Sequence, residues 1–414
     1  MKRYDSYKPS GISWIGEIPS HWETKRIGTI LLRLNSDLGD TYIKVGLENI
    51  TSWTGKYLQT ETIYDGSGIS FEIGDLLYGK LRPYLAKTWV AEFKGQAVGD
   101  FYVLRCKNNS NNDFVKFMLL NRKLVFLLDS LTYGAKMPRV SWDDMSRVYV
   151  PIPPLEEQKK IVEYLSTKTS LIDAQQRERE RELRLLEELK QVEIANVVTR
   201  GLNPDVPMKD SGIPWIGQIP AHWEVKRLGA FFNDNISSNS EYKFDRAYKF
   251  NYGTIVPKNE IGDVSDLRET YLKYSVLKQD DIIINGLNLN YDFVSQRVAI
   301  SPTDCIITSA YIVLRPASNT YSQYFLQLFK AMDSKKLFHG MGTGIRLTLS
   351  FNELKSQLLP IPPIEEQRAI VEYIEKKNKA IDDMIANLRA EIDFLTEYKQ
   401  RLIADAVTGQ IKID

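Results

Sequence analysis

Two short stretches of the chain hold residues whose types and order could do chemistry on phosphate groups. Gly74–Lys80 has the first seven positions of a phosphate-binding loop, but Leu81 follows where that loop needs a serine or threonine to hold magnesium. Asp75, Glu92 and Lys94 have the order of a metal-dependent nuclease, although this spacing is common by chance. The sequence therefore predicts no nucleotide site, no resident metal and no catalytic residue in this chain.

The composition excludes several other classes of site. With only three histidines and with Cys106 and Cys305 as its only thiols, the chain has neither a disulfide framework nor a clustered zinc site. It contains no run of eighteen apolar residues and no amino-terminal signal, so we expect a cytoplasmic protein without membrane contact. A length of 414 residues predicts two or more domains.

An octet that occurs twice marks the start of two helices. Pro-Ile-Pro-Pro-Leu-Glu-Glu-Gln at 151–158 returns as Pro-Ile-Pro-Pro-Ile-Glu-Glu-Gln at 360–367. Proline fixes φ near its helical value and lacks an amide hydrogen, so Pro154 and Pro363 are expected at the first helical positions. The glutamates that follow suit the positive end of the helix dipole. The repetition indicates a gene duplication.

A second repeat precedes the octets. Residues 10–28 and 211–229 are identical at fourteen of nineteen positions. Their tryptophans could form a stacking platform for sugars or bases, but large aromatic side chains more often anchor a segment by burial. We therefore expect Trp14, Trp22, Trp215 and Trp223 to hold these segments on their domains.

The blocks between the repeats alternate short apolar runs with Gly, Asn and Asp, which is typical of strands. The first block predicts strands at Tyr42–Ile50, Asp75–Tyr78 and Phe101–Arg105 and a helix at Asp113–Ser130. In the second block, Asp281–Ile284 and Tyr311–Arg315 correspond to the last two of these strands. The rest of the two blocks differs almost completely.

Each octet is followed by a long helical segment. In the second, apolar residues recur every seven positions, which predicts a coiled-coil seam. In the first, the polar stretch 175–182 interrupts that stripe. Both helices should end where Gly201 and Gly409 can take the left-handed conformation. The side chains predicted to pack the helices together or to contact a partner are Ile172, Leu183, Leu186, Ile381, Ile385, Leu388, Ile392, Leu395 and Leu402.

Charge is distributed unevenly along the chain. Residues 1–150 hold 20 basic and 16 acidic side chains, whereas residues 360–414 hold 8 and 11. A mildly basic block between acidic helices permits phosphate binding without requiring it.

Taken together, the repeats resemble the specificity subunit of a type I restriction-modification enzyme. The resemblance rests on the duplicated octet followed by Ile-Val-Glu-Tyr, on the variable block before each copy, on the long helix after it, and on the entry segments Gly16–Trp22 and Gly217–Trp223. It covers essentially the whole chain.

The resemblance implies two tandem target-recognition domains of α/β (α+β) fold, separated by two long helices packed as an antiparallel coiled coil. The expected boundaries are 1–150 for the first domain, 151–205 for the first helix, 206–359 for the second domain and 360–414 for the second helix. It also implies a non-catalytic subunit that binds double-stranded DNA. Modification subunits would bring S-adenosylmethionine, and restriction subunits would bring ATP and magnesium.

Duplicated halves give a physical reason for this plan. Halves related by a pseudo-two-fold axis offer two similar faces, so two modification subunits can bind, with stretch 175–182 as a candidate face. Two readers in the major groove lie about one helical turn, ~34 Å, apart with unread bases between them. Because the two blocks differ in sequence, we expect an asymmetric, interrupted target.

Base readout favours arginine on guanine and asparagine or glutamine on adenine, while lysine and arginine contact phosphates. The candidate DNA-binding residues are Lys80, Arg82, Tyr84, Lys87, Lys136 and Arg139 in the first block and Asn285, Asn288, Asn290, Arg297 and Arg346 in the second. Any one of them could instead be structural. The alternatives to this function are a specificity chain of a related system that cuts on both sides of its site, a metal-dependent nuclease, and a coiled-coil scaffold without DNA function.

Overall fold

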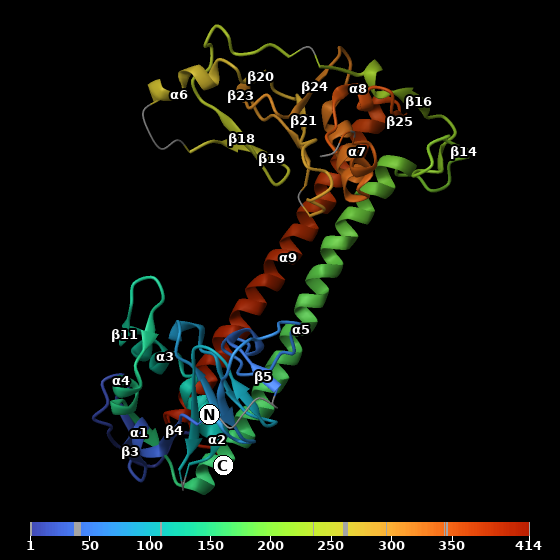
Figure 1. Ribbon diagram of the computed structural model, residues 1–414. Helices are drawn as coiled ribbons and strands as arrows, with labels where there is room; N and C mark the ends of the chain where they lie inside the picture. Colours follow the sequence, from blue (N-terminus) through green and yellow to red (C-terminus); the bar gives the residue numbers. More distant parts are fainter. Residues whose placement is uncertain are drawn as a thin grey trace. The chain divides into compact units, whose positions relative to one another are not determined.

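The computed structural model describes residues 2–36, 43–107, 110–234, 236–259, 264–294, 296–342, 344 and 347–413 (Figure 1). The chain forms two compact units, one made of residues 1–180 and 389–414 and the other of residues 181–388. Each unit therefore contains one variable block and a part of both long helices.

The first unit is built around an antiparallel sheet with the strand order β4-β10-β7-β8. Its strands are β4 (Leu31–Leu34), β7 (Leu76–Gly79), β8 (Thr88–Val90) and β10 (Phe101–Cys106). A second sheet has the order β5-β9-β6, from β5 (Ile43–Val45), β6 (Ile69–Phe71) and β9 (Gly95–Ala97). The first unit also contains three separate strand pairs: β1 (Tyr7–Pro9) with β2 (Glu17–Pro19), β3 (Glu23–Arg26) with β13 (Tyr149–Ile152), and β11 (Thr132–Tyr133) with β12 (Arg139–Val140). Its short helices are α1 (Ile27–Ile30), α2 (Asn112–Leu119), α3 (Arg122–Ser130), α4 (Trp142–Arg147), η1 (Leu47–Asn49) and η2 (Pro83–Leu85).

The second unit repeats the main sheet with the strand order β17-β24-β21-β22. Its strands are β17 (Phe232–Asn233), β21 (Ile282–Ile284), β22 (Val298–Ile300) and β24 (Ile312–Pro316). The strand pairs are β14 (Met208–Asp210) with β15 (Gln218–Pro220), β16 (Glu224–Arg227) with β25 (Leu358–Ile361), β18 (Tyr248–Asn251) with β19 (Thr254–Pro257), and β20 (Ser275–Leu277) with β23 (Cys305–Ile307). Its short helices are η3 (Leu228–Ala230), α6 (Val264–Tyr271), α7 (Ser322–Ser334), η4 (Leu337–Gly340) and α8 (Phe351–Leu354).

Both main sheets are covered on both faces. Along β7, Leu76 and Tyr78 pack into one apolar cluster, while Leu77 packs into another on the opposite face. Along β21, Ile282 and Ile283 divide in the same way. Because successive side chains of a strand point to opposite faces, a strand buried on both sides needs an uninterrupted apolar run.

A buried aspartate that forms an ion pair with an arginine of the neighbouring strand precedes each of these central strands. Asp75 binds the guanidinium of Arg105 through both carboxylate oxygens, with N–O distances of 2.7 Å each. In the second unit, Asp281 binds Arg315 at 3.1 and 2.7 Å. A two-point contact of this kind fixes direction as well as distance, so it sets the register between each central strand and its neighbour.

The long helices are α5 (Leu155–Arg200) and α9 (Ile364–Val407). Both begin one residue later than predicted, since Pro154 and Pro363 lie just before the helical residues. The glutamine that closes each octet donates to a proline carbonyl at the helix start, at 2.9 Å in both copies. The glycine ends are confirmed, because Gly201 and Gly409 have φ values of +73° and +71°.

The remaining strand and helix predictions met with mixed results. The strands predicted around residues 76–78, 101–105, 282–284 and 312–315 are present. The single helix predicted at 113–130 is wrong, because Asn121 accepts a bond from the amide of Lys123 and starts a separate helix, α3. The strand predicted at 42–50 is short, and the 3₁₀ turn η1 occupies its second half.

The tryptophans of the entry segments are anchors, as predicted. Trp22 and Trp223 are fully buried, and Trp14 and Trp215 pack partly buried against the same apolar clusters. Among the described residues, no helix is long and apolar enough to cross a membrane.

Candidate nucleic-acid interface

Each variable block is fastened to the start of its own helix by the duplicated motifs. His21 of the first entry segment lies 2.8 Å from the carboxylate of Glu157, the second glutamate of the first octet. The equivalent pair in the second unit is His222 and Glu366, also at 2.8 Å. The octets therefore have a positioning role, because they connect the block that carries the variable loops to a rigid helix.

In the first block, the two predicted basic loops lie against each other. Main-chain bonds join them, from the amide of Arg82 to the carbonyl of Pro138 at 2.8 Å and from the amide of Val140 to the carbonyl of Lys80 at 3.1 Å. Residues 80–84 and 136–139 are far apart in sequence, so the fold brings together two groups of candidates that the sequence could only name separately.

Lys80 and Arg139 share the carboxylate of Asp100 as an ion-pair partner. Arg139 binds its carboxylate through two nitrogens at 2.9 and 3.0 Å, and the Lys80 amine lies 3.9 Å from one of its oxygens. Both cations are therefore partly neutralised within the block. Arg82, Tyr84 and Lys136 are exposed, and they are the candidates of this block best placed to reach a ligand.

The backbone around Arg82 is in an unusual conformation. Arg82 and Ala86 both have left-handed φ values, of 51° and 47°, and they enclose the turn η2. Side chains with a Cβ atom adopt this region at a cost, and such residues are concentrated at sites that hold ligands. Lys87 closes the loop, because its partly buried amine donates to the carbonyl of Leu47 at 2.7 Å. Burial lowers the pKa of this amine, which fits a structural lysine better than a phosphate contact.

The candidates of the second block gather in the loop between β21 and β22. There Arg297 is 1% exposed, and its guanidinium donates to the carbonyls of Leu287 and Asp292 at 2.9 and 2.7 Å and to the carbonyl of Asn285 at 3.0 Å. The prediction of Arg297 as a DNA contact therefore needs correction. The side chain is buried and its two terminal nitrogens are bonded to main-chain carbonyls of the loop, so Arg297 shapes the loop.

The loop that Arg297 shapes carries the asparagines. Asn288 is exposed and has a φ of 51°, whereas Asn285 and Asn290 are half-buried. Arg346, the remaining candidate, lies outside the described residues. Phe293, which was not among the predicted residues, is exposed and stacks on the ring of His339 at a centroid distance of 4.6 Å. An aromatic residue beside a run of asparagines was the available signal.

The two sets of candidates occupy equivalent places in the two units. Residues 80–87 connect β7 to β8, and residues 285–297 connect β21 to β22. Each loop also lies beside a later segment, since Leu349 bonds to the carbonyl of Gly286 at 2.9 Å just as Val140 bonds to Lys80. Each loop follows the carboxyl end of the equivalent strand in the main sheet of its own unit, but the two loops differ in length and chemistry.

An open groove of the first unit adds residues that the sequence did not suggest. It has a volume of about 370 Å³ and is lined by Gly28, Leu31, Leu32, Arg33, Asn35, Lys107, Trp142 and Ser146. The Arg33 guanidinium lies 4.9 Å from the centre of the Tyr102 ring, and the Lys80 amine lies 5.4 Å from it. Two basic side chains of the groove and of the first basic loop, Arg33 and Lys80, therefore lie against the same aromatic ring. Arg33 was not a candidate because it stands in an apolar strand sequence.

Within each unit, α5 and α9 run antiparallel. In the first unit Gln176 donates to Thr396 at 2.7 Å and Arg179 lies 2.8 Å from Glu391, while in the second Lys190 lies 2.6 Å from Asp382. Of the side chains predicted to pack the helices together or to contact a partner, five are buried (Ile172, Ile381, Ile385, Leu388 and Leu402) and four are half-buried (Leu183, Leu186, Ile392 and Leu395).

The chemistry suggested by isolated motifs does not survive in the structure. Asp75 is held by Arg105, and Lys94 pairs with Glu72 at 2.8 Å, so the order Asp75, Glu92, Lys94 forms no nuclease centre. The stretch 74–80 contains strand β7 where a phosphate-binding loop would need a helix start. No group of three or more metal-ligating side chains was found in the part of the chain that the structure describes.

Known proteins share both the sequence pattern and the architecture. A family model described as the type I restriction modification DNA specificity domain matches residues 19–184 and again 220–393. The type I restriction enzyme MjaVIII specificity subunit of Methanocaldococcus jannaschii is 27% identical, over 96% of this chain and 94% of its own.

Two solved structures show the same fold. One, from work on complex assembly and conformational transition of the type I R-M system, has a TM-score of 0.69 at 18% identity and covers 95% of this chain and 99% of its own. The HsdS subunit of Thermoanaerobacter tengcongensis has a TM-score of 0.54 at 20% identity and covers 95% and 98%. Since the family model matches both halves of the sequence, the chain belongs to the family of type I restriction-modification DNA specificity domains, in which it is a DNA sequence-specificity subunit.

Proposed function

We propose that each variable block reads one half of a bipartite, asymmetric DNA site. The observation that carries the proposal is the pair of loops at equivalent places in the two units. The loop at 80–87 offers basic side chains with Tyr84, whereas the loop at 285–297 offers asparagines with the exposed Tyr291 and Phe293. Arginine suits guanine and asparagine suits adenine, so the same frame would read different bases at its two ends. Arg82 and Asn288, both exposed, are the first base-reading candidates.

The helices would hold the two readers at a set spacing and dock the modification subunits. The duplication supports a pseudo-two-fold relation, because the octets are 209 positions apart and the same offset converts the pair Asp173–Lys399 into the pair Asp382–Lys190. Equivalent polar pairs on antiparallel helices support a coiled coil with two similar faces. Two modification subunits, one on each face, complete the proposal.

The proposed subunit does no chemistry itself. Asp75, which belongs to both the phosphate-loop stretch and the nuclease-like order, is paired with Arg105 between two strands of the main sheet. We therefore assign adenine methylation with S-adenosylmethionine to the modification subunits, and ATP-driven, magnesium-dependent cleavage to restriction subunits.

The test is a map of methylated adenines in the genome of a host that carries the gene with its modification subunits. Deleting the gene should abolish methylation at one motif made of two different half-sites separated by unread bases. If every methylated motif persists after the deletion, the proposed function is wrong. Salt provides a second check, because binding through phosphates weakens steeply as salt rises.

A further inference from the structure

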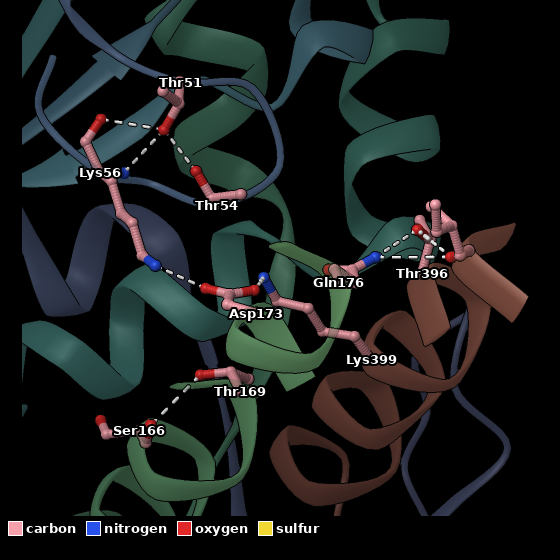
Figure 2. A network of polar contacts seen from close by, with 10 residues as sticks. Thr51, Thr54, Lys56, Ser166, Thr169, Asp173, Gln176, Thr396 and Lys399 are labelled. Atoms are coloured by element: carbon pink, nitrogen blue, oxygen red, sulfur yellow. Dashed lines mark hydrogen bonds and ion pairs between the residues drawn. The ribbon is translucent and has the colours of Figure 1, made fainter. Parts of the chain in front are cut away.

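One carboxylate of α5 connects three elements of the first unit. Asp173 accepts from Lys56 of the first block through one oxygen and from Lys399 of α9 through the other, at 2.5 Å in both cases (Figure 2). Only 10% of the Asp173 side chain and 9% of the Lys399 side chain are exposed. Burial alone would raise the pKa of Asp173, but the hydrogen bonds and charges of Lys399 and Lys56 hold it below its ordinary value. Each oxygen of the carboxylate is therefore paired with one lysine.

The lysine from the block is presented by a braced turn. The main chain of Lys56 exchanges bonds with Thr51, whose amide donates to the Lys56 carbonyl at 3.0 Å and whose hydroxyl accepts from the Lys56 amide at 3.2 Å. The amide of Trp53 in the same turn donates to the carbonyl of Ala86 at 3.2 Å. Gly55 has a φ of +62° and lies against the Thr88 carbonyl so closely that a Cβ atom would clash with it. The position of Lys56 is therefore coupled to the main sheet.

The second unit shows what this contact adds. Asp382 and Lys190 are the positions equivalent to Asp173 and Lys399, and they are paired at 2.6 Å. This pair is much more open, with 57% and 28% of the two side chains exposed, and its contact joins two helices without a described side chain of the block. A pair between helices fixes their register, whereas the contact in the first unit also fixes the block.

We propose that Asp173 is a positioning residue that sets where the first block stands along the paired helices, and so sets the spacing between half-sites that the assembled enzyme accepts. The inference rests on the proposed function, since it concerns how a two-part site is measured. Each oxygen of this buried carboxylate has a defined partner, and a shift of the block along α5 would separate Lys56 from Asp173 and lose a charge-assisted hydrogen bond.

The experiment measures spacing selectivity with the complete modification complex. The genome map supplies the motif, and duplexes are then made with the native number of bases between half-sites, with one more and with one fewer. The readout is the methylation rate at native spacing divided by the rate at each altered spacing. Loss of folded protein lowers all three rates together, whereas loss of positioning changes their ratio.

Lys56→Met removes the contact from the block and leaves the pair Asp173–Lys399 in place. Because Lys56 is half-exposed, we expect a selectivity lower by about threefold to fivefold, as for a solvent-screened ion pair. Asp173→Asn should lower it by about tenfold or more, since Lys399 then stays buried without its carboxylate. Lys56→Arg, which keeps the charge, should restore most of the selectivity. The matched control is Asp382→Asn, which breaks the equivalent open pair and should change the ratio by less than about twofold.

Unchanged ratios in both Lys56→Met and Asp173→Asn would overturn the inference, and so would equal losses at all three spacings. A change in Asp382→Asn as large as that in Asp173→Asn would also overturn it, because spacing selectivity would then not depend on the contact between the first block and the helices. If the wild-type complex methylates no bipartite motif, the proposed function fails first. Methylation of that motif with selectivity independent of Lys56 defeats only the inference.

Discussion

The loops that follow β7 and β21 occupy equivalent places in the two units but differ in length and chemistry. Residues 80–87 form a short basic loop that is closed by Lys87 bonding to a neighbouring turn. Residues 285–297 form a longer loop rich in asparagine, which is closed by a buried arginine inside the loop itself. The sheets that carry them keep the same strand order and the same buried ion pair. The loops where recognition is proposed therefore differ, whereas the main sheet that carries each of them has the same strand order.

The largest effect should come from the residue that shapes the second loop. Arg297→Met would leave several buried carbonyls without donors, each costing about 1–3 kcal/mol. We expect the second unit to lose about 3 kcal/mol or more of its free energy of unfolding, measured by urea titration with a probe in that unit. Lys87→Met at the equivalent place removes one bond and should cost about 1 kcal/mol. Equal losses in the two variants would remove the distinction between the loops.

Removal of the arginine should cost the two equivalent ion pairs, Asp75–Arg105 and Asp281–Arg315, different amounts of stability. Arg315→Leu leaves the fully buried Asp281 without its partner, and we expect a loss of about 3 kcal/mol. The side chain of Arg105 is 48% exposed, so water can reach the Asp75 pair and Arg105→Leu should cost about 1–2 kcal/mol. Thermal unfolding of the two variants, compared with the wild type, gives both values. A larger loss from Arg105→Leu would show that exposure does not govern these pairs.

A surface change in the first loop should act on DNA and not on folding. Arg82→Ala should weaken binding of the assembled enzyme by about 1 kcal/mol and, if the contact is to a phosphate, reduce the slope of affinity against salt by about 1. The control is Lys94→Ala, which removes a basic side chain that pairs with Glu72 away from the loop. Titration of labelled duplex at several salt concentrations tests this, and an Arg82→Ala slope equal to that of Lys94→Ala would exclude Arg82 from the interface.

The smallest expected effect is the loss of unfolding free energy from the Asp173 contacts at acid pH. The folded-state pKa of Asp173 lies below its ordinary value of 3.8, so its contribution to stability is present above that pH and is lost as pH falls through the lower folded value. The difference in unfolding free energy between the wild type and Asp173→Asn should therefore shrink below about pH 4. A difference that is constant from pH 7 to pH 3 would mean that the carboxylate is not held in its charged form.

The sequence predicted the frame of the fold because the frame is repetitive. Two octets, two entry segments and two terminal glycines each occur at a nearly constant offset, and heptads identify α9 without any tertiary information. The break between α2 and α3 was missed because Asn121 acts as a cap only through a local backbone geometry. The strand β5 was overestimated because the chain turns into η1 after Gly46, where the Asn49 side chain accepts from the Gly46 amide at 2.9 Å.

The candidate site was predictable as two loops but not as individual contacts. Arginine at 297 has the residue type expected of a DNA contact, and only burial shows that its donors bind the chain itself. Asp100 gave no signal as the meeting point of Lys80 and Arg139, because it lies in a different loop from either. The cluster around Asp173 was also invisible, since its three members come from positions 56, 173 and 399.

The central expectation is that the two loops read two half-sites independently of each other. The decisive measurement is the map of methylated adenines made with a variant in which Asn288 is replaced by alanine and, separately, one in which Arg82 is replaced. Each replacement should relax or change bases in one half of the motif, a different half for each, while the other half and the spacing stay as in the wild type. Changes in the same half for both replacements, or in both halves for either, would contradict the account.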